Sequence, residues 1–273
     1  MTPRDTIAAI SVELEQRARA FERARDPRCV FARAYAELNR VLADALPYAG
    51  FKDPTWIANL SIRFAEQYVH ALREYDAGKL PKGAWYTVFR ASERGRTTVL
   101  EELILGMTAH IVNDLPQALC EVGMSTDSGG SRIADFHLMN DILGQAVERI
   151  QIELQRRYDP LLGVLDHVAQ QHDEILTNYG IRLSRANAWY NAERLLEPRC
   201  REDALAAISK SPEVMVREVI DPPIYSFRFL LRLAHRIGRI ARRWPSDQRV
   251  RLTHAPYVSE PNINLEQISI QKL

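Results

Sequence analysis

His110 and Asp114 are the two residues whose chemical types and spacing are best suited to a working site. Four residues apart on a helix, an imidazole and a carboxylate lie on the same side, one turn from each other. Such a pair can bind one divalent metal ion, or the carboxylate can orient the imidazole for proton transfer. The alternative without chemistry is a hydrogen bond between two polar groups of the core.

The helix expected over residues 97–122 presents this pair to the protein interior. Its apolar face is defined by residues that recur with the period of an α-helix: Leu100, Leu103, Ile104, Met107, Ile111, Ala118 and Val122. Asp114 projects within this face and His110 lies at its edge, whereas Glu101 and Glu102 fall outside it and are expected in solvent. Because Pro116 removes one backbone hydrogen bond, we expect a kink beside the pair.

Other polar residues are expected to point inward from neighbouring helices: Asp135 in helix 131–157, His172 in helix 160–178 and Arg185 in helix 181–196. A buried arginine needs a carboxylate, which Asp114 or Asp135 could supply as a purely structural partner. A lone histidine on an apolar face, such as His172, is more often a core residue than a metal ligand.

Together these residues predict a metal-dependent enzyme acting on a small molecule. His110, Asp114 and Asp135 would hold a divalent ion, with His172 as a further ligand, and this mixture of nitrogen and oxygen suits zinc, manganese or iron. Hydrolysis is the expected reaction, although elimination or ring closure needs similar groups. Arg185 would neutralise an aspartate or bind an anionic substrate. Two alternatives stay open: metal-free acid/base catalysis by His110, or a non-catalytic helical binding or scaffold protein.

The elements that must position these residues are helices along nearly the whole chain. We expect an all-α, bundle-like single domain over residues 1–244, followed by an irregular tail at 245–273. The remaining helices are expected near 4–25, 28–46, 54–76, 81–93, 200–209, 212–219 and 222–244. Starts are marked by a capping side chain before proline, as at Asp26-Pro27, Asp53-Pro54, Ser211-Pro212 and Asp221-Pro222, and Thr2-Pro3 with Asp5 is a similar start. The segment 224–244 carries a stripe of arginines and predicts a basic helix with a solvated face.

Composition narrows the class of protein further. The chain has 273 residues, 46% hydrophobic and 26% charged, which is ordinary for a globular protein. A net charge of +1 favours no nucleic-acid partner. Three widely spaced cysteines, no apolar signal segment and no transmembrane stretch predict a cytoplasmic protein. A homo-oligomer stays open.

Several stretches resemble a family of bacterial and fungal helical proteins classed as a domain of unknown function. The most specific is Gly-Met-x-Ala-His-Ile-x-x-Asp-Leu-Pro, which stands here at residues 106–116. The weaker matches are Trp85 with Phe89, Asp135-Phe136 with Asn140, and Arg185 with Ala188, Trp189 and Ala192. The resemblance covers roughly residues 55–197. It implies that His110, Asp114, Asp135 and Arg185 belong together, and it implies no reaction.

Overall fold

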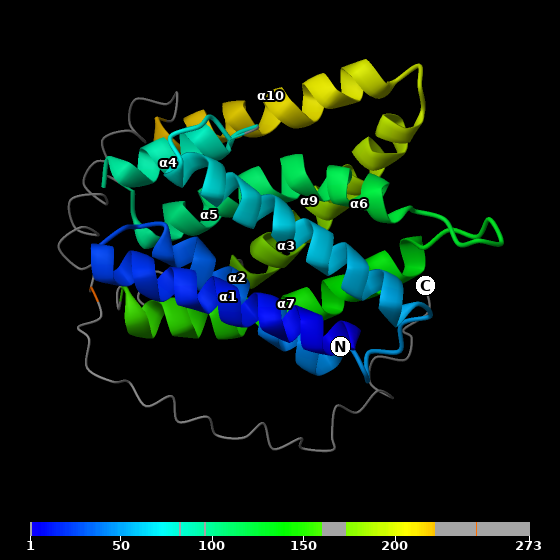
Figure 1. Cartoon of the computed structure of the whole chain (residues 1–273), viewed down its shortest axis with the longest axis horizontal. Helices are drawn as coiled ribbons and strands as arrows, with labels where there is room; N and C mark the ends of the chain where they lie inside the picture. The colour runs from blue at the N-terminus through cyan, green and yellow to red at the C-terminus, as the bar shows by residue number, and fades with distance from the viewer. Residues whose placement is uncertain (1, 82, 96, 160–172, 222–243, 245–273) are drawn as a thin grey trace.

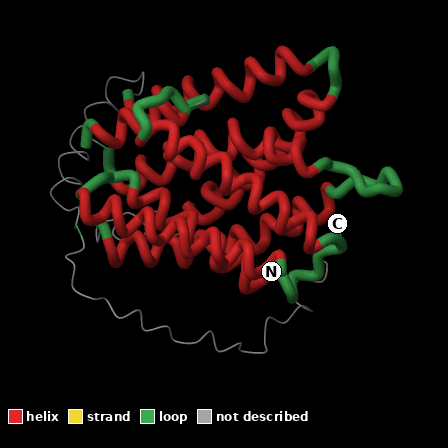
Figure 2. Tube along the Cα trace, viewed as in Figure 1, coloured by secondary structure: helices red, strands yellow, loops and turns green. Residues whose placement is uncertain are grey.

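The chain is mainly helical in the part that the computed structural model describes, which is residues 2–81, 83–95, 97–159, 173–221 and 244, without the side chains of 173–179. Within these residues there is no strand, and extended pairing is limited to an isolated bridge between Ser125 and Ser131 (Figure 2). The predicted all-α class is therefore confirmed. The expected tail at 245–273 and the basic helix, apart from Trp244, lie outside the described residues.

The helices pack in a layered bundle. Their bounds are α1 (Pro3–Ala24), α2 (Cys29–Ala45), α3 (Pro54–Asp76), α4 (Trp85–Glu93), α5 (Val99–Ala109), a π-helix η1 (His110–Asp114), α6 (Leu115–Val122), α7 (Ile133–Arg157), α9 (Asp173–Leu196) and α10 (Arg201–Ile220). Figure 1 shows α1, α2 and α7 together on one side and α10 on the other, with α3, α5, α6 and α9 between them. No described helix has the length and apolar character needed to cross a membrane.

Local sequence signals fix the starts of several helices. Thr2 caps α1 in a reciprocal hydrogen-bonded box with Asp5, and Asp53 caps α3 by accepting a hydrogen bond from the amide of Trp56 at 2.9 Å. These side chains satisfy amide groups that a helix start would otherwise leave without partners. The proline-marked starts of α1 and α3 are thus confirmed.

The expected break at Ser211-Pro212 is wrong, because α10 runs without interruption through Pro212. The buried residues of this helix are Ala204, Ile208, Pro212 and Val216, spaced four apart on one face. Proline at this position packs as one more apolar side chain, and burial of the whole face outweighs the hydrogen bond that proline cannot form. Similarly, α9 is continuous across residues 178–181, where a break was expected.

Candidate active site

A π-helical turn positions the predicted pair. The helix expected over 97–122 is divided into α5, η1 and α6, and η1 consists of the five residues from His110 to Asp114. The amide of Leu115 donates to the carbonyl oxygen of His110, five residues earlier. Pro116 has no amide hydrogen, so the chain accommodates it by widening one turn rather than by losing the helix. Turns of this kind occur frequently at functional sites.

The carboxylate of Asp114 is held by three donors. Oδ2 accepts hydrogen bonds from Nδ1 of His110 and Nε1 of Trp85, each at 2.8 Å, and Oδ1 accepts one from the side-chain amide of Asn113 at 2.6 Å. Asp114 is 3% exposed, so these contacts replace the water that a carboxylate would otherwise require. Both oxygens of the carboxylate are therefore engaged within the protein.

His110 is enclosed by aromatic rings. Phe64 stacks on the imidazole with a centroid separation of 3.6 Å, and Tyr35 meets it edge-on at 4.7 Å. Burial lowers the pKa of His110 below its ordinary value, and the opposing effect of Asp114 does not restore it. Its Nε2 atom is buried and has no hydrogen-bond partner among the described residues. The imidazole is thus fixed in position, with Nδ1 bonded to Asp114 and Nε2 unpaired within the part of the chain that the structure describes.

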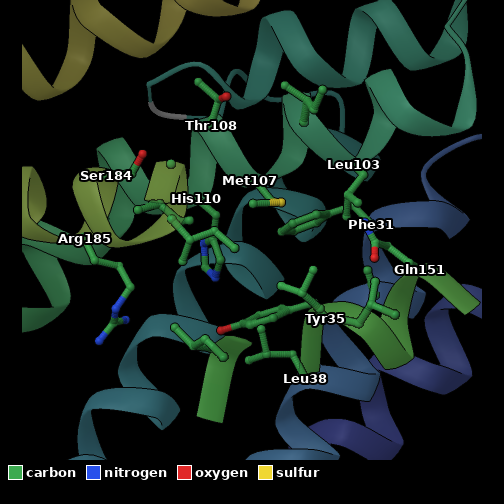
Figure 3. Close-up of a pocket in the computed structure, with 18 of the residues that line it drawn as sticks. Phe31, Tyr35, Leu38, Leu103, Met107, Thr108, His110, Gln151, Ser184 and Arg185 are labelled. Carbon is green, nitrogen blue, oxygen red and sulfur yellow. The ribbon is translucent and has the colours of Figure 1, made fainter. Parts of the chain in front are cut away.

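His110 lines a cavity of about 450 Å³ between α2, α3, α5, α7 and α9. Most of the lining side chains are aliphatic or aromatic, and Figure 3 shows His110 between Met107 and Tyr35, with Leu103 toward the opposite end from Arg185. A volume of this size suits a small organic ligand, for which about 300–1,000 Å³ is usual.

The part of the predicted apolar face that lies on α5 and η1 lines this cavity, whereas Ala118 on α6 is buried in the close-packed core. Leu100 and Ile104 are 45% and 37% exposed. The expectation that Glu101 and Glu102 lie in solvent is wrong, because they are 6% and 2% exposed. Glu101 closes a capping box with Thr98, and Glu102 accepts a hydrogen bond from the Ser92 hydroxyl at 2.7 Å. Hydrogen-bond partners at the end of α4 and at the start of α5 therefore allow the face of α5 that carries Glu101 and Glu102 to be buried.

Arg185 on α9 also lines this cavity. Its Nε donates to the side-chain oxygen of Asn140 at 2.6 Å, its Nη2 donates to the carbonyl oxygen of Phe136 at 2.9 Å, and the guanidinium lies 4.0 Å from the centre of the Phe136 ring. The expected pairing of Arg185 with Asp114 or Asp135 is not observed. Among the described residues no carboxylate pairs with it, and burial lowers its pKa to about 9.

The structure does not bring Asp135 to His110. Its two oxygens accept hydrogen bonds from the backbone amides of Lys52 and Asp53, at 3.0 and 2.7 Å, so it secures the connection that leads into α3. Phe64, which stacks on His110, lies eleven residues further along α3, or about 16 Å of helix. His172 lies outside the described residues, and within them no group of three or more His, Cys, Asp or Glu side chains is placed to share a metal ion.

Several residues of the site are not evident from the sequence as members of it. Phe64 and Tyr35 occupy ordinary apolar positions, and nothing in their sequence context distinguishes them from core residues. Trp85 carries a usable signal, because a buried indole needs an acceptor for its N–H. Gly83 carries another: at its φ of +61° an added Cβ would lie 2.5 Å from Oδ1 of Asn113, so this glycine leaves room for the amide that donates to Asp114.

Comparison with known proteins places the chain in a family. The model of a family described as a family of unknown function, DUF5995, matches residues 7–222. The match therefore extends well beyond the 55–197 expected from the motifs. No curated protein and no solved structure matches the chain.

Proposed function

The chain belongs to the DUF5995 family of unknown function, and from the geometry of its cavity we propose a metal-free acid/base enzyme that acts on a small, mainly apolar molecule. The observation that carries this proposal is the hydrogen bonding of the two ring nitrogens of His110. His110 lines the cavity, its Nε2 is buried without a partner among the described residues, and its Nδ1 is held by Asp114.

The hydrogen bond to Asp114 decides which nitrogen of His110 carries the proton. A carboxylate oxygen only accepts, so Nδ1 is the protonated nitrogen and Nε2 presents its lone pair. The lowered pKa keeps the imidazole neutral at neutral pH. His110 is therefore prepared to take a proton from a substrate or a water molecule, and Asp114 would stabilise the imidazolium that forms.

A metal-dependent reaction, which the sequence predicts first, is the second candidate. Nε2 of His110 is free to bind an ion, and metal-bound histidines commonly donate their other nitrogen to a carboxylate, as His110 does to Asp114. Asp114 already accepts hydrogen bonds from His110, Trp85 and Asn113, which leaves about one acceptor site on its carboxylate for an ion. This prior use of the carboxylate is the reason for preferring acid/base chemistry.

A purely architectural role for the pair is disfavoured by the unused nitrogen. A core histidine that only ties helices together gains from satisfying both ring nitrogens, and leaving one buried polar atom without a partner costs about 1–3 kcal/mol. In a ligand-binding cavity the same atom has a use, because a bound molecule or water supplies the missing partner.

The proposal is tested by hydrolysis of a series of nitrophenyl esters with aliphatic acyl chains, since hydrolysis is the simplest reaction that a general base supports. We expect the wild-type protein to exceed His110→Gln by about 10²–10⁴-fold, the usual contribution of a positioned acid or base. Asp114→Asn should also lose rate, because the imidazole is no longer held in one tautomer. His137→Gln, an exposed histidine on α7, serves as the matched control and should leave the rate unchanged.

Elemental analysis of protein purified without an affinity tag accompanies the assay. One metal ion per chain that is absent from His110→Gln, with a melting temperature that falls on chelation, would replace the proposal by the metal-dependent alternative. Metal at a hundredfold above its dissociation constant stabilises a protein by about 2.7 kcal/mol, which a thermal melt detects. Wild-type protein that hydrolyses none of the esters, or a fully active His110→Gln, would contradict acid/base catalysis.

A further inference from the structure

We infer that the cavity takes a monocarboxylic acid with an apolar body, whose carboxylate pairs with Arg185 while its hydrocarbon lies along the exposed apolar face of α5. The inference rests on the proposed function in one respect, which is that the acid binds in the same cavity as the proposed catalytic His110. It names the chemical class of ligand that this cavity recognises.

Arg185 supplies the argument for an acid. The side chain is 5% exposed, and it contacts a neutral amide, a carbonyl oxygen and the face of an aromatic ring. Asn140 and Phe136 orient the guanidinium without neutralising it. A pKa of about 9 still leaves the group charged at neutral pH, so the protein holds a buried positive charge with no anion among the described residues. A buried charge in this condition is costly unless a ligand completes the pair.

The rest of the cavity supplies the argument for an apolar body. Leu103, Ile104 and Met107 turn toward it from α5, and Leu143 and Val147 turn toward it from α7. Figure 3 shows Arg185 at one end of the view and Leu103 with Gln151 toward the other, so the charge and much of the aliphatic wall are separated along the cavity. A molecule with an acid at one end and hydrocarbon behind it matches this distribution.

Charge balance favours a carboxylate over a phosphate. One guanidinium neutralises one negative charge, and a carboxylate can accept two parallel hydrogen bonds from it. A phosphate monoester carries nearly two negative charges at neutral pH. His110 is held neutral beside Asp114 and offers no second positive charge. A phosphate would therefore bring a surplus negative charge into an apolar cavity.

Calorimetric titration of the full chain with decanoate, decan-1-ol and decyl phosphate tests the inference. These probes share one hydrocarbon chain and differ in the head group. We expect decanoate to bind at least about tenfold more tightly than the alcohol, as one charge-assisted contact predicts. Arg185→Met keeps an apolar side chain of similar length and should lose this preference while still binding decan-1-ol. His137→Gln should retain it, because His137 is exposed on α7 and does not line the cavity.

Equal binding of decanoate and decan-1-ol by the wild-type protein would overturn the inference, as would no binding of any probe. This comparison needs no variant, so it stands even if Arg185→Met does not fold. Tighter binding of decyl phosphate would overturn the assignment of a carboxylate. The proposed function is tested by a different result. If the protein prefers decanoate but shows no catalysis that depends on His110, the inference about the ligand stands and the proposed function is contradicted.

Discussion

At the level of single residues, the buried imidazole of His110 links protein stability to pH. Burial lowers its pKa in the folded chain, whereas in the unfolded chain it returns to its ordinary value of 6.5. Between these two values the unfolded state binds more protons, so the stability contributed by neutral His110 is complete above pH 6.5 and is lost as the pH falls below it.

We therefore predict that the free energy of unfolding falls more steeply with acid in the wild-type protein than in His110→Gln. One histidine contributes at most about 1.4 kcal/mol per pH unit. Urea denaturation at about pH 7.5 and about pH 5.5 measures the difference for both proteins. His137→Gln should keep the wild-type slope, because that side chain is exposed on α7. Parallel slopes for the wild-type protein and His110→Gln would show that folding does not lower the pKa of His110.

The sequence predicts the contact between these residues within one helix, but not their contacts with other helices. The spacing of His110 and Asp114 predicts their contact, and the structure places them 2.8 Å apart in the protein interior. Their further partners come from distant segments: Trp85 lies 29 residues from Asp114, and Phe64 belongs to α3. No periodicity within one helix indicates which side chain of another helix will meet it. For the same reason the partner of Arg185 is an asparagine and not the expected aspartate.

At the level of elements, Gly106 fixes how closely α5 approaches α2. A Cβ added at Gly106 would lie 2.4 Å from the ring of Phe31, whereas a Cβ at Gly180 on α9 would meet no described atom within 4 Å. Phe31 in turn lines the cavity and meets His110 edge-on at 5.9 Å. Gly106 is thus required for packing at the wall of the cavity.

Gly106→Ala and Gly180→Ala should therefore have opposite effects on stability. Overpacking against Phe31 should lower the free energy of unfolding by about 1–3 kcal/mol and weaken decanoate binding. The same substitution in the open position of α9 should raise it by about 0.5–1 kcal/mol, because alanine favours a helix more than glycine does. Denaturant titration of both variants measures this. A Gly106→Ala variant as stable as the wild-type protein would mean that α5 and α2 can separate without loss.

Helix existence follows from sequence more readily than helix orientation. Capping residues and proline predict where α1 and α3 start, and both starts are observed. The apolar face of residues 97–122 is also real, but it borders a cavity, and the side with Glu102 is the one buried. The spacing of apolar residues identifies an apolar face without saying whether protein or ligand will cover it. Likewise, the π-helical turn is one of two responses to Pro116, the other being the expected kink.

On the scale of the whole molecule, a buried cluster of charges joins the N-terminal helices to α7. Glu22 on α1 is 6% exposed and contacts Arg33 on α2 at 2.9 Å, Arg157 on α7 at 2.8 Å and the hydroxyl of Tyr158 at 2.5 Å. One carboxylate thus neutralises side chains from two other helices. In this cluster the buried charges are paired with one another within the protein. Arg185 of the cavity differs, because it has no carboxylate partner among the described residues.

Glu22→Gln should accordingly destabilise the whole bundle. Removing the shared carboxylate leaves Arg33 with Glu15 at 3.2 Å and Arg157 with Glu153 at 3.6 Å, and both of these glutamates are partly exposed. The buried positive charge is then less well compensated, and breaking a buried pair typically costs about 3–5 kcal/mol. Glu13→Gln is the matched control, since Glu13 also lies on α1 and contacts two arginines, Arg17 at 3.0 Å and Arg73 at 3.3 Å, but is 43% exposed. Exposed pairs contribute about 0–1 kcal/mol. Urea denaturation distinguishes the two variants, and equal, small losses would show that water reaches the Glu22 cluster. Because the cluster does not line the cavity, a Glu22→Gln protein that remains folded should keep its preference for decanoate over decan-1-ol, so that stability and ligand recognition are separable in this fold.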